Sequence, residues 1–356
     1  MPIQVPSPAR RTVTGDLALY AAVGTFLLGA AFCMAQVEAV SPKATLRNIA
    51  ASRAGHGTEL LPSRNVVYAF QPDTKADQPL HILTSGRSAV VSPSVPVGGE
   101  LRAVAPLGRD DLLLYVAATG RSSVGGIYRV AAGAGAGEPR RVIDTATVER
   151  ASGMGTLLAL ADVQMVGAGG DVWLILRHPD QTAFCRFDVA QFLAGTPRLG
   201  RPFERVTVDG QAIGIDPGDR WTGRADGGLD LFRPTTGESW RVDAFGRASP
   251  LVTLSEDRPR PTAPPLTLGR GTSRVLQFFP KPPPSATAAE EAVRYPALVI
   301  SDGATERVIE SDAIDVRPGF PVHALRITAW CVEPLTGDVI AYDAMSGEVF
   351  RLTFSE

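Results

Sequence analysis

The pattern of hydrophobic positions changes once along the chain, between residues 40 and 58. Residues 17–35 read LALYAAVGTFLLGAAFCMA, without one charged side chain. A helix of this length, at about 1.5 Å per residue, crosses the hydrocarbon core of a bilayer. Beyond residue 58, short apolar runs alternate with turns of Gly, Pro, Asp and Ser, which is typical of β-strands. The pattern predicts a membrane-spanning helix followed by an all-β domain.

The apolar segment has three interpretations: an uncleaved membrane anchor, a cleaved secretory signal and a buried core helix. Its apolar run exceeds the roughly 7–15 residues of a signal peptide, so we expect an anchor at residues 17–40 after a short head at 1–16. Positive charges flank both ends and do not orient it. We expect a cytoplasmic N-terminus and a periplasmic domain, or a secreted domain if the signal is cleaved. The predicted lipid-contacting side chains are Leu17, Phe26, Leu27, Leu28 and Phe32.

Residues 41–57 connect the apolar segment to the predicted β domain at residues 58–356. They begin with Ser41 and Pro42, the residue types that favour an N-cap and a first helical position. We therefore expect a short helix over residues 41–53 within a juxtamembrane linker.

One unit recurs in the β domain: a strand, a polar turn, and a second strand centred on an arginine between apolar residues. The last copy reads VIAYDA, then the turn MSG, then VFRL. Strands joined by so short a turn form a β-hairpin. Residues 66–70 and 80–82 make a degenerate copy. The five clear copies are marked by an opening residue and an arginine: Asp111 and Arg129, Gly170 and Arg186, Gly228 and Arg241, Ala297 and Arg307, Gly337 and Arg351.

The spacing of these arginines, 57, 55, 66 and 44 residues, is close to the ~40–50 residues of propeller blades once insertions are allowed for. With its "GD, apolar, Tyr-Asp, Ser-Gly, apolar-Arg-Leu" hairpins, the chain resembles the β-propeller family, including the YVTN, NHL and quinoprotein-like groups. The resemblance covers residues 60–356 and implies a fold but no particular function. We expect about six blades, with a range of five to seven. The alternative is a β-sandwich or two small barrels.

Composition excludes several classes of function. The chain is 44% hydrophobic and 20% charged, with a net charge of −2, so it should fold and should not attract nucleic acid. Of its three cysteines, Cys33 lies in the apolar segment, which leaves at most one disulfide, between Cys185 and Cys331. The four histidines are scattered and form no ligand pattern. We predict no metal site, no cofactor and no catalytic residue.

Some local patterns imitate functional sites. The sequence His178-Pro179-Asp180 joins two predicted strands and is interpreted as a turn. An acidic run could bind calcium, but its spacing is irregular and its Asp-Gly and Asp-Pro pairs are typical of turns. We expect the recurring arginines to form structural ion pairs or to pack on aromatic rings. The acidic run consists of Asp209, Asp216, Asp219, Asp226 and Asp230.

The absence of catalytic motifs favours a binding role, and a proline-rich insertion at residues 258–284 is interpreted as a contact arm, with a passive surface loop as the alternative. Proline is excluded from central strands, so we expect the insertion to protrude as an arm. Arg258, Arg260, Arg270 and Arg274 would contact a partner there. The sequence therefore predicts a non-catalytic, membrane-anchored scaffold, or an accessory subunit of a larger respiratory or photosynthetic complex, with lipid and other protein subunits as partners. The alternatives are a propeller enzyme, acting as a hydrolase, lactonase or lyase, and an envelope ligand sensor.

Overall fold

The chain divides into two units, Met1–Ser41 and Pro42–Glu356. All residues that the computed structural model describes belong to the second unit. The described residues are 44–51, 59–63, 66–70, 80–84, 87–91, 96, 98–107, 111–119, 124–131, 138–154, 162–252, 258–268, 274–281, 295–316 and 325–354.

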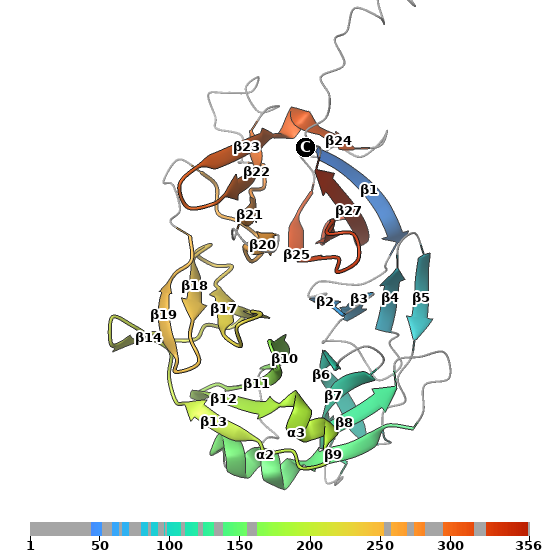
Figure 1. Cartoon of the computed structure of the whole chain (residues 1–356), viewed down its shortest axis with the longest axis vertical. Coiled ribbons are helices and arrows are strands. Elements are labelled where there is room, and N and C mark those ends of the chain that lie inside the picture. The colour runs from blue at the N-terminus through green and yellow to red at the C-terminus, as the bar shows by residue number, and fades with distance from the viewer. Residues whose placement is uncertain are drawn as a thin grey trace, which may run out of the picture. The chain divides into compact units, whose positions relative to one another are not determined.

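The strands in these ranges form six sheets that follow one another around a ring (Figure 1). The first three sheets contain β2 (Glu59–Pro62), β3 (Val67–Phe70), β4 (Leu80–Thr84) and β5 (Arg87–Val91); β6 (Gly99–Leu107), β7 (Asp111–Ala118), β8 (Gly126–Ala131) and β9 (Arg140–Asp144); and β10 (Asp162–Ala168), β11 (Asp171–His178), β12 (Gln181–Asp188) and β13 (Gly200–Phe203).

The fourth sheet contains β14 (Thr207–Val208), β15 (Gln211–Ala212), β16 (Arg220–Gly223), β17 (Leu229–Phe232), β18 (Ser239–Val242) and β19 (Arg247–Pro250). The fifth contains β20 (Leu266–Leu268), β21 (Arg274–Phe278), β22 (Pro296–Ser301) and β23 (Glu306–Glu310). The sixth contains β24 (Ile314–Val316), β1 (Ala44–Ala51), β27 (Glu348–Phe354), β26 (Val339–Asp343) and β25 (Ile327–Val332). We name the sheets B1 to B6 in this order.

Each sheet contains an antiparallel meander whose innermost strand lies at the ring's centre, which is the architecture of a β-propeller (Figure 1). B4 and B6 carry additional outer strands, and there β14 pairs with β19 and β24 pairs with β1 in parallel. The predicted fold is therefore confirmed, and the six sheets seen among the described strands lie within the expected range. The five clear hairpins each occupy a separate sheet, as predicted: β7–β8, β11–β12, β17–β18, β22–β23 and β26–β27. The degenerate copy is β3–β4 in B1.

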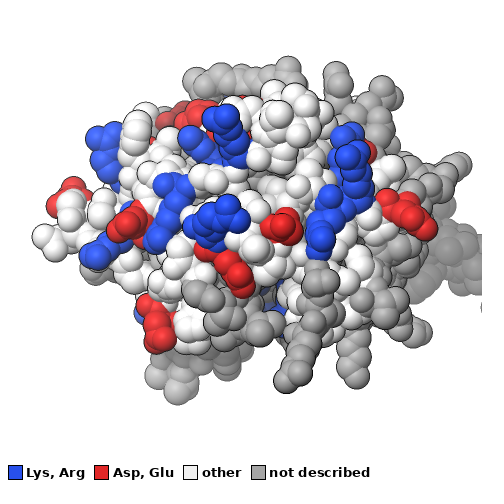
Figure 2. Space-filling view, turned by 90° about the horizontal axis from the view of Figure 1, so that it is seen from below, with Lys and Arg blue, Asp and Glu red and all other residues white. Residues whose placement is uncertain are grey.

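Four of the recurring arginines, Arg129, Arg186, Arg241 and Arg351, form ion pairs with carboxylates in or beside the strands of the same sheet. Arg129 donates to Asp111, with its Nε 3.0 Å from Oδ2, and Arg351 Nη2 lies 2.8 Å from Glu333 Oε2. Arg186 lies 3.5 Å from Asp171 and also stacks on the Trp173 ring. Opposite charges are intermixed over the side of the molecule seen in Figure 2. The predicted structural role is confirmed for these four arginines.

Pairing between the two ends of the domain closes the ring. β1 runs antiparallel to β27, from the pair Ala44 and Phe354 to the pair Ala51 and Glu348. The predicted helix at residues 41–53 is therefore wrong. The Ser-Pro signal is local and weak, whereas β27 offers a full edge of unpaired backbone groups that a strand satisfies. Pairing across some 300 residues thus overrides local helix preference.

The described parts of the proline-rich stretch, residues 258–268 and 274–281, do not form a protruding arm. Residues 258–284 include β20 and β21, which form half of B5. Before β20, Arg258 pairs with Glu306 of β23 at 2.7 Å, and Arg260 Nη1 donates to the Thr235 carbonyl of B4 at 2.7 Å. Pro261, Ala263, Pro264 and Pro265 are buried. Residues 258–265 thus form a connector that binds to B4 and B5. Proline is tolerated there because an irregular connection needs no hydrogen bonds to a neighbouring strand.

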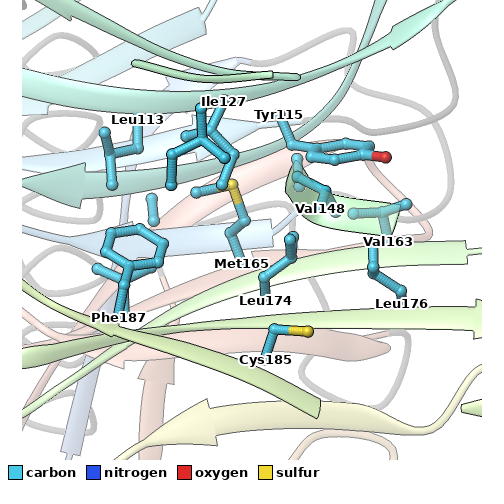
Figure 3. Close-up of a cluster of buried hydrophobic side chains, with 14 of the residues drawn as sticks. Leu113, Tyr115, Ile127, Val148, Val163, Met165, Leu174, Leu176, Cys185 and Phe187 are labelled. Atoms are coloured by element: carbon cyan, nitrogen blue, oxygen red, sulfur yellow. The ribbon is translucent and has the colours of Figure 1, made fainter. Parts of the chain in front are cut away.

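Hydrophobic clusters between neighbouring sheets form the core. Figure 3 shows the cluster between B2 and B3, where Leu113, Tyr115 and Ile127 face Met165, Leu174 and Phe187. Val148, on helix α2 (Thr145–Ser152), closes one side of it. Cys185 lies in this cluster and Cys331 in the one between B6 and B1, and both are free thiols. The disulfide that the sequence allowed is therefore not formed.

Helices are few among the described residues. α2 is capped by Asp144, whose side chain accepts from Thr147 N, and α3 (Val189–Leu193) is capped by Asp188. A 3₁₀ turn, η2 (Ser311–Ala313), precedes β24. None of the helices in the described part has the length and apolar character that a membrane crossing requires. The predicted anchor at residues 17–40, with Leu17, Phe26, Leu27, Leu28 and Phe32, lies outside the described residues.

Candidate functional site

The innermost strands of the sheets enclose a central cavity of ≈ 340 Å³. Its wall receives residues from β2, β6, β10, β16, β20 and β25, so every sheet contributes. Each of these strands is the edge of its sheet, and its unpaired backbone groups therefore face the ring's centre. The cavity is the concave feature that the propeller architecture itself produces, and such features are the usual location of small-molecule sites.

Most of the cavity wall is apolar. Two tryptophans contribute to it, and the indole N–H of Trp330 is already used, because it donates to the Pro264 carbonyl at 2.5 Å. Trp330 therefore offers only its ring to the cavity. The apolar wall residues are Leu60, Leu61, Pro62, Pro106, Met165, Val166, Trp221, Pro264, Leu266, Ala329, Trp330, Cys331 and Val332.

Gln164 is a wall residue with a structural role. Its Nε2 donates to Asp162 Oδ2 at 3.0 Å and to the Asp219 carbonyl at 2.9 Å, and its Oε1 accepts from Trp221 N at 3.2 Å. The amide therefore joins β10 to the start of β16 across the gap between B3 and B4. Because both ends of the amide are occupied, Gln164 holds the wall in place and has little capacity left for a ligand.

The segment before β16 is fixed by a buried ion pair. Asp219, whose side chain is 1% exposed, receives the Arg233 guanidinium at 3.1 and 2.9 Å. Arg233 also pairs with Asp216 at 2.9 Å and donates to the Gly214 carbonyl at 2.6 Å. Its pKa is raised, chiefly by the hydrogen bond with Asp219. This network places Arg220, the next residue after Asp219, on the cavity wall.

Three threonines and Arg220 are the polar wall groups that remain available. The Thr328 hydroxyl is buried and has no hydrogen-bond partner among the described residues. Thr267 is exposed to the cavity, and Thr222 is half-buried. Arg220 forms no ion pair with a carboxylate in the described ranges. A buried polar atom without a partner costs free energy, so a ligand that satisfies Thr328 would gain affinity.

Two charged residues give the cavity a polar end. Glu59 is the first residue of β2 and Arg220 the first residue of β16. Because the innermost strands of a meandering propeller run in the same direction, both residues lie toward the same end of the ring. Pro62, Pro106 and Val332 end or nearly end their strands and make the opposite end apolar. The cavity thus matches an elongated molecule with one polar end.

Glycine makes the cavity wall continuous between B3 and B4. A Cβ added to Gly223 would lie 1.9 Å from the Gly167 carbonyl oxygen, so the backbones of β10 and β16 touch without any side chain between them. Only glycine permits this approach. The close contact seals the wall beside Arg220 and Thr222, and it fixes the width of the cavity at this point.

Cys331 is a wall residue without nucleophilic character. Its thiol is fully buried, and burial raises its pKa, with a smaller contribution from Glu333. At neutral pH it is therefore a thiol, and only the thiolate attacks carbon. Among the described residues, no three side chains of His, Cys, Asp or Glu are placed to bind a metal ion.

The residues singled out in the sequence do not line this cavity. Arg258 stacks on Phe279, Arg260 bonds to B4, Arg274 begins β21, and Arg270 lies outside the described residues. In the acidic run, Asp216 and Asp219 pair with Arg233, and Asp226 and Asp230 pair with Arg224. The wall residues come from six distant segments. The only sequence signal for them is that five of the segments directly precede a recognised hairpin, whereas β20 is separated from the β22–β23 hairpin by β21.

No protein-family model and no curated protein matches the chain. Solved structures with a similar fold include the calcium-binding protein regucalcin from Agrobacterium tumefaciens, with 13% identity over 86% of this chain and 93% of the other, and a TM-score of 0.46. A putative gluconolactonase shows 12% identity over 90% and 97%, with a TM-score of 0.48. Virginiamycin B lyase from Staphylococcus aureus shows 10% identity over 88% and 99%, with a TM-score of 0.42.

The predicted scaffold function requires correction. It was drawn from the absence of catalytic motifs and from a proline-rich segment expected to contact a partner, and Arg258 and Arg260 of that segment instead bind B5 and B4. Two of the similar structures are named as a putative gluconolactonase and a lyase, and at 12% and 10% identity they show a likeness of fold alone. Lipid and partner subunits are tested by none of these observations and stay predictions.

Proposed function

We propose that the protein binds a small, largely apolar molecule with one polar end in the central cavity of the propeller. The observation that carries this proposal is the combination of an apolar wall with a buried Thr328 hydroxyl and an Arg220 guanidinium that have, respectively, no hydrogen-bond partner and no carboxylate partner among the described residues. Apolar pockets with a few fixed polar groups are typical of small-molecule sites. The apolar wall would supply affinity, and the polar groups would orient the ligand.

The size and charge of the cavity restrict the ligand. A volume of ≈ 340 Å³ is near the lower end of the range for ligand pockets, so the molecule is small. The Arg220 guanidinium favours a carboxylate or a polarised carbonyl, and Thr328 favours a hydrogen-bond acceptor. Medium-chain carboxylic acids and their lactones have both features, and their chains would contact Leu60, Met165 and Trp330.

Turnover of the same ligand is a second candidate function. Glu59 is a carboxylate on the wall toward the same end as Arg220. In such a pair, the carboxylate can accept and return a proton, and the guanidinium can stabilise negative charge on an oxygen of the ligand. The reactions that fit are hydrolysis of a lactone or elimination from a carboxylic acid. A Glu59→Gln variant that binds the ligand but does not convert it would support this function.

Binding can be tested with a panel of carboxylic acids of roughly six to ten carbons and their lactones, by thermal shift and then calorimetry. Thr267→Phe fills the cavity from its exposed side and should abolish binding without loss of stability. Thr328→Val removes the hydroxyl at equal volume and should weaken binding by roughly tenfold. Arg198→Gln, an exposed arginine outside the cavity, is the control and should bind as wild type does.

The Thr267→Phe variant decides the site. If a ligand from the panel binds this variant with wild-type affinity, the central cavity is not its binding site. If no acid or lactone of the panel raises the unfolding temperature of the wild type or of Thr328→Val, the proposed ligand chemistry is contradicted.

We also propose that residues 17–40 anchor the propeller to a membrane, with the propeller on the extracytoplasmic side. The support is the uncharged run at residues 17–35. A propeller held at a membrane in this way would meet apolar molecules that partition between lipid and water.

A further inference from the structure

A second concave site lies between B3 and B4, away from the central cavity. It is a groove of ≈ 670 Å³ lined by the β11–β12 turn, by the end of β13 and by the segment after β15. This site includes the His178-Pro179-Asp180 turn, whose sequence had no assigned function. The turn joins β11 to β12 as expected, and it forms one wall of the groove.

Three arginines and a histidine gather in this groove. Arg177 is half-buried, and its Nε is buried without a hydrogen-bond partner among the described residues. Arg201 uses Nη1 to donate to the Ser152 carbonyl at 3.1 Å, which leaves its other donors available. Arg205 is exposed, and neither Arg177 nor Arg205 pairs with a described carboxylate. This differs from the hairpin arginines, which pair within their own sheets.

Carboxylates do not neutralise the groove. Of its two acidic residues, Asp180 has a side chain that is 90% exposed and lies 3.7 Å from His178 Nδ1, and Glu204 is exposed. Solvent screens both, whereas the Arg177 Nε is shielded from water. The base of the groove is apolar, with Phe184 buried and Ile213 half-buried. The groove therefore combines positive charge at its walls with an apolar base.

We propose that this groove is a binding site for a small organic anion that carries two or more carboxylate, sulfate or phosphate groups on an apolar body. Guanidinium groups bind such acids through paired, charge-assisted hydrogen bonds, and separate arginines can bind separate acidic groups. The apolar body would lie on Phe184 and Ile213. The site is independent of the central cavity, because the residues that line one are absent from the other.

The test uses benzene-1,3,5-tricarboxylate as the probe and benzoate as its singly charged analogue, in calorimetry at low salt. We expect the tricarboxylate to bind more tightly than benzoate, and to lose affinity at high salt because the interaction is electrostatic. Arg177→Gln and Arg205→Gln should each weaken binding roughly tenfold. Arg140→Gln removes the same charge from the exposed first residue of β9 in B2 and should leave affinity unchanged.

Two further measurements make the result decisive. The Thr267→Phe variant should bind the tricarboxylate as wild type does, which separates this site from the central cavity. Arg205 is exposed, so Arg205→Gln will fold even if Arg177→Gln does not. Equal affinity of wild type, Arg205→Gln and Arg140→Gln for the tricarboxylate would overturn the proposal, as would the absence of binding by wild type.

Discussion

The ion pair between Asp219 and Arg233 predicts a large and specific loss of stability. In Arg233→Met, the Asp219 carboxylate loses both guanidinium contacts, at 2.9 and 3.1 Å, while its side chain stays 1% exposed. Removing one partner of a buried pair costs about 3–5 kcal/mol, because the other charge stays buried and uncompensated. Loss of the stacking of Arg233 on Trp240, at 5.3 Å, adds about 0.5–1 kcal/mol.

One retained contact reduces this loss. The Asp216 backbone N–H still donates to Asp219 Oδ2 at 2.8 Å, so we expect the lower half of the range, about 3–4 kcal/mol. The double variant Asp219→Asn/Arg233→Met also removes the negative charge that the single variant Arg233→Met leaves buried without a partner. Its loss in free energy of unfolding should therefore be smaller than the sum of the two single losses, by about 1–3 kcal/mol.

Urea unfolding, followed by both far-UV circular dichroism and tryptophan fluorescence, measures these free energies if the two probes give one transition. Arg247→Met is the matched control, because Arg247 is 72% exposed in its pair with Asp243 and should contribute at most about 0.5 kcal/mol. Equal losses in Arg233→Met and Arg247→Met would refute the argument that burial makes the first pair important. If the loss in the double variant equals the sum of the two single losses, the explanation by an uncompensated buried Asp219 charge is refuted.

The remaining predictions concern a helix cap and the membrane anchor. Hydrogen bonds from Thr147 lower the pKa of the Asp144 carboxyl at the start of α2, so this carboxylate stabilises the fold above its ordinary pKa and loses its effect as pH falls through the lowered value. Asp144→Ala should therefore lower the free energy of unfolding by about 1 kcal/mol near pH 7 and by much less near pH 2. Urea unfolding of wild type and variant at both pH values measures this, and an equal loss at low pH contradicts the cap. Residues 17–35 should keep the protein in the membrane fraction after carbonate extraction, and an intact mass that begins after residue 35 would show a cleaved signal instead.

Local patterns in the sequence predicted the central hairpins correctly. The strand pair β26–β27 is specified by residues that are adjacent in the sequence: an apolar run, a tight turn and a second strand that pairs with the first. The same holds for β11–β12, which includes the His178-Pro179-Asp180 turn. Because both members of such a pair lie within about 20 residues, no distant part of the chain is needed to identify them. The ion pairs of Arg129 and Arg351 follow from the same local register.

Features that depend on distant partners were missed. The predicted helix at residues 41–53 is strand β1 because its partner, β27, lies at the other end of the domain. The connector at residues 258–265 looked like a free arm, since the sequence does not show that Glu306 and Thr235 hold it. The central cavity was hidden for the same reason, because each of its six strands contributes only a few side chains. Such sites exist only once the ring has closed.

The closure of the ring by β1 and β27 has a consequence for protein synthesis. The ribosome makes β1 some 300 residues before residues 348–354, which form the strand edge that receives it. Until then, the apolar faces that B1 and B6 turn toward each other in the closed ring are uncovered, and β1 presents an unpaired strand edge that can pair with another chain. The nascent domain therefore needs protection, for example by a chaperone, until residues 348–354 have been made.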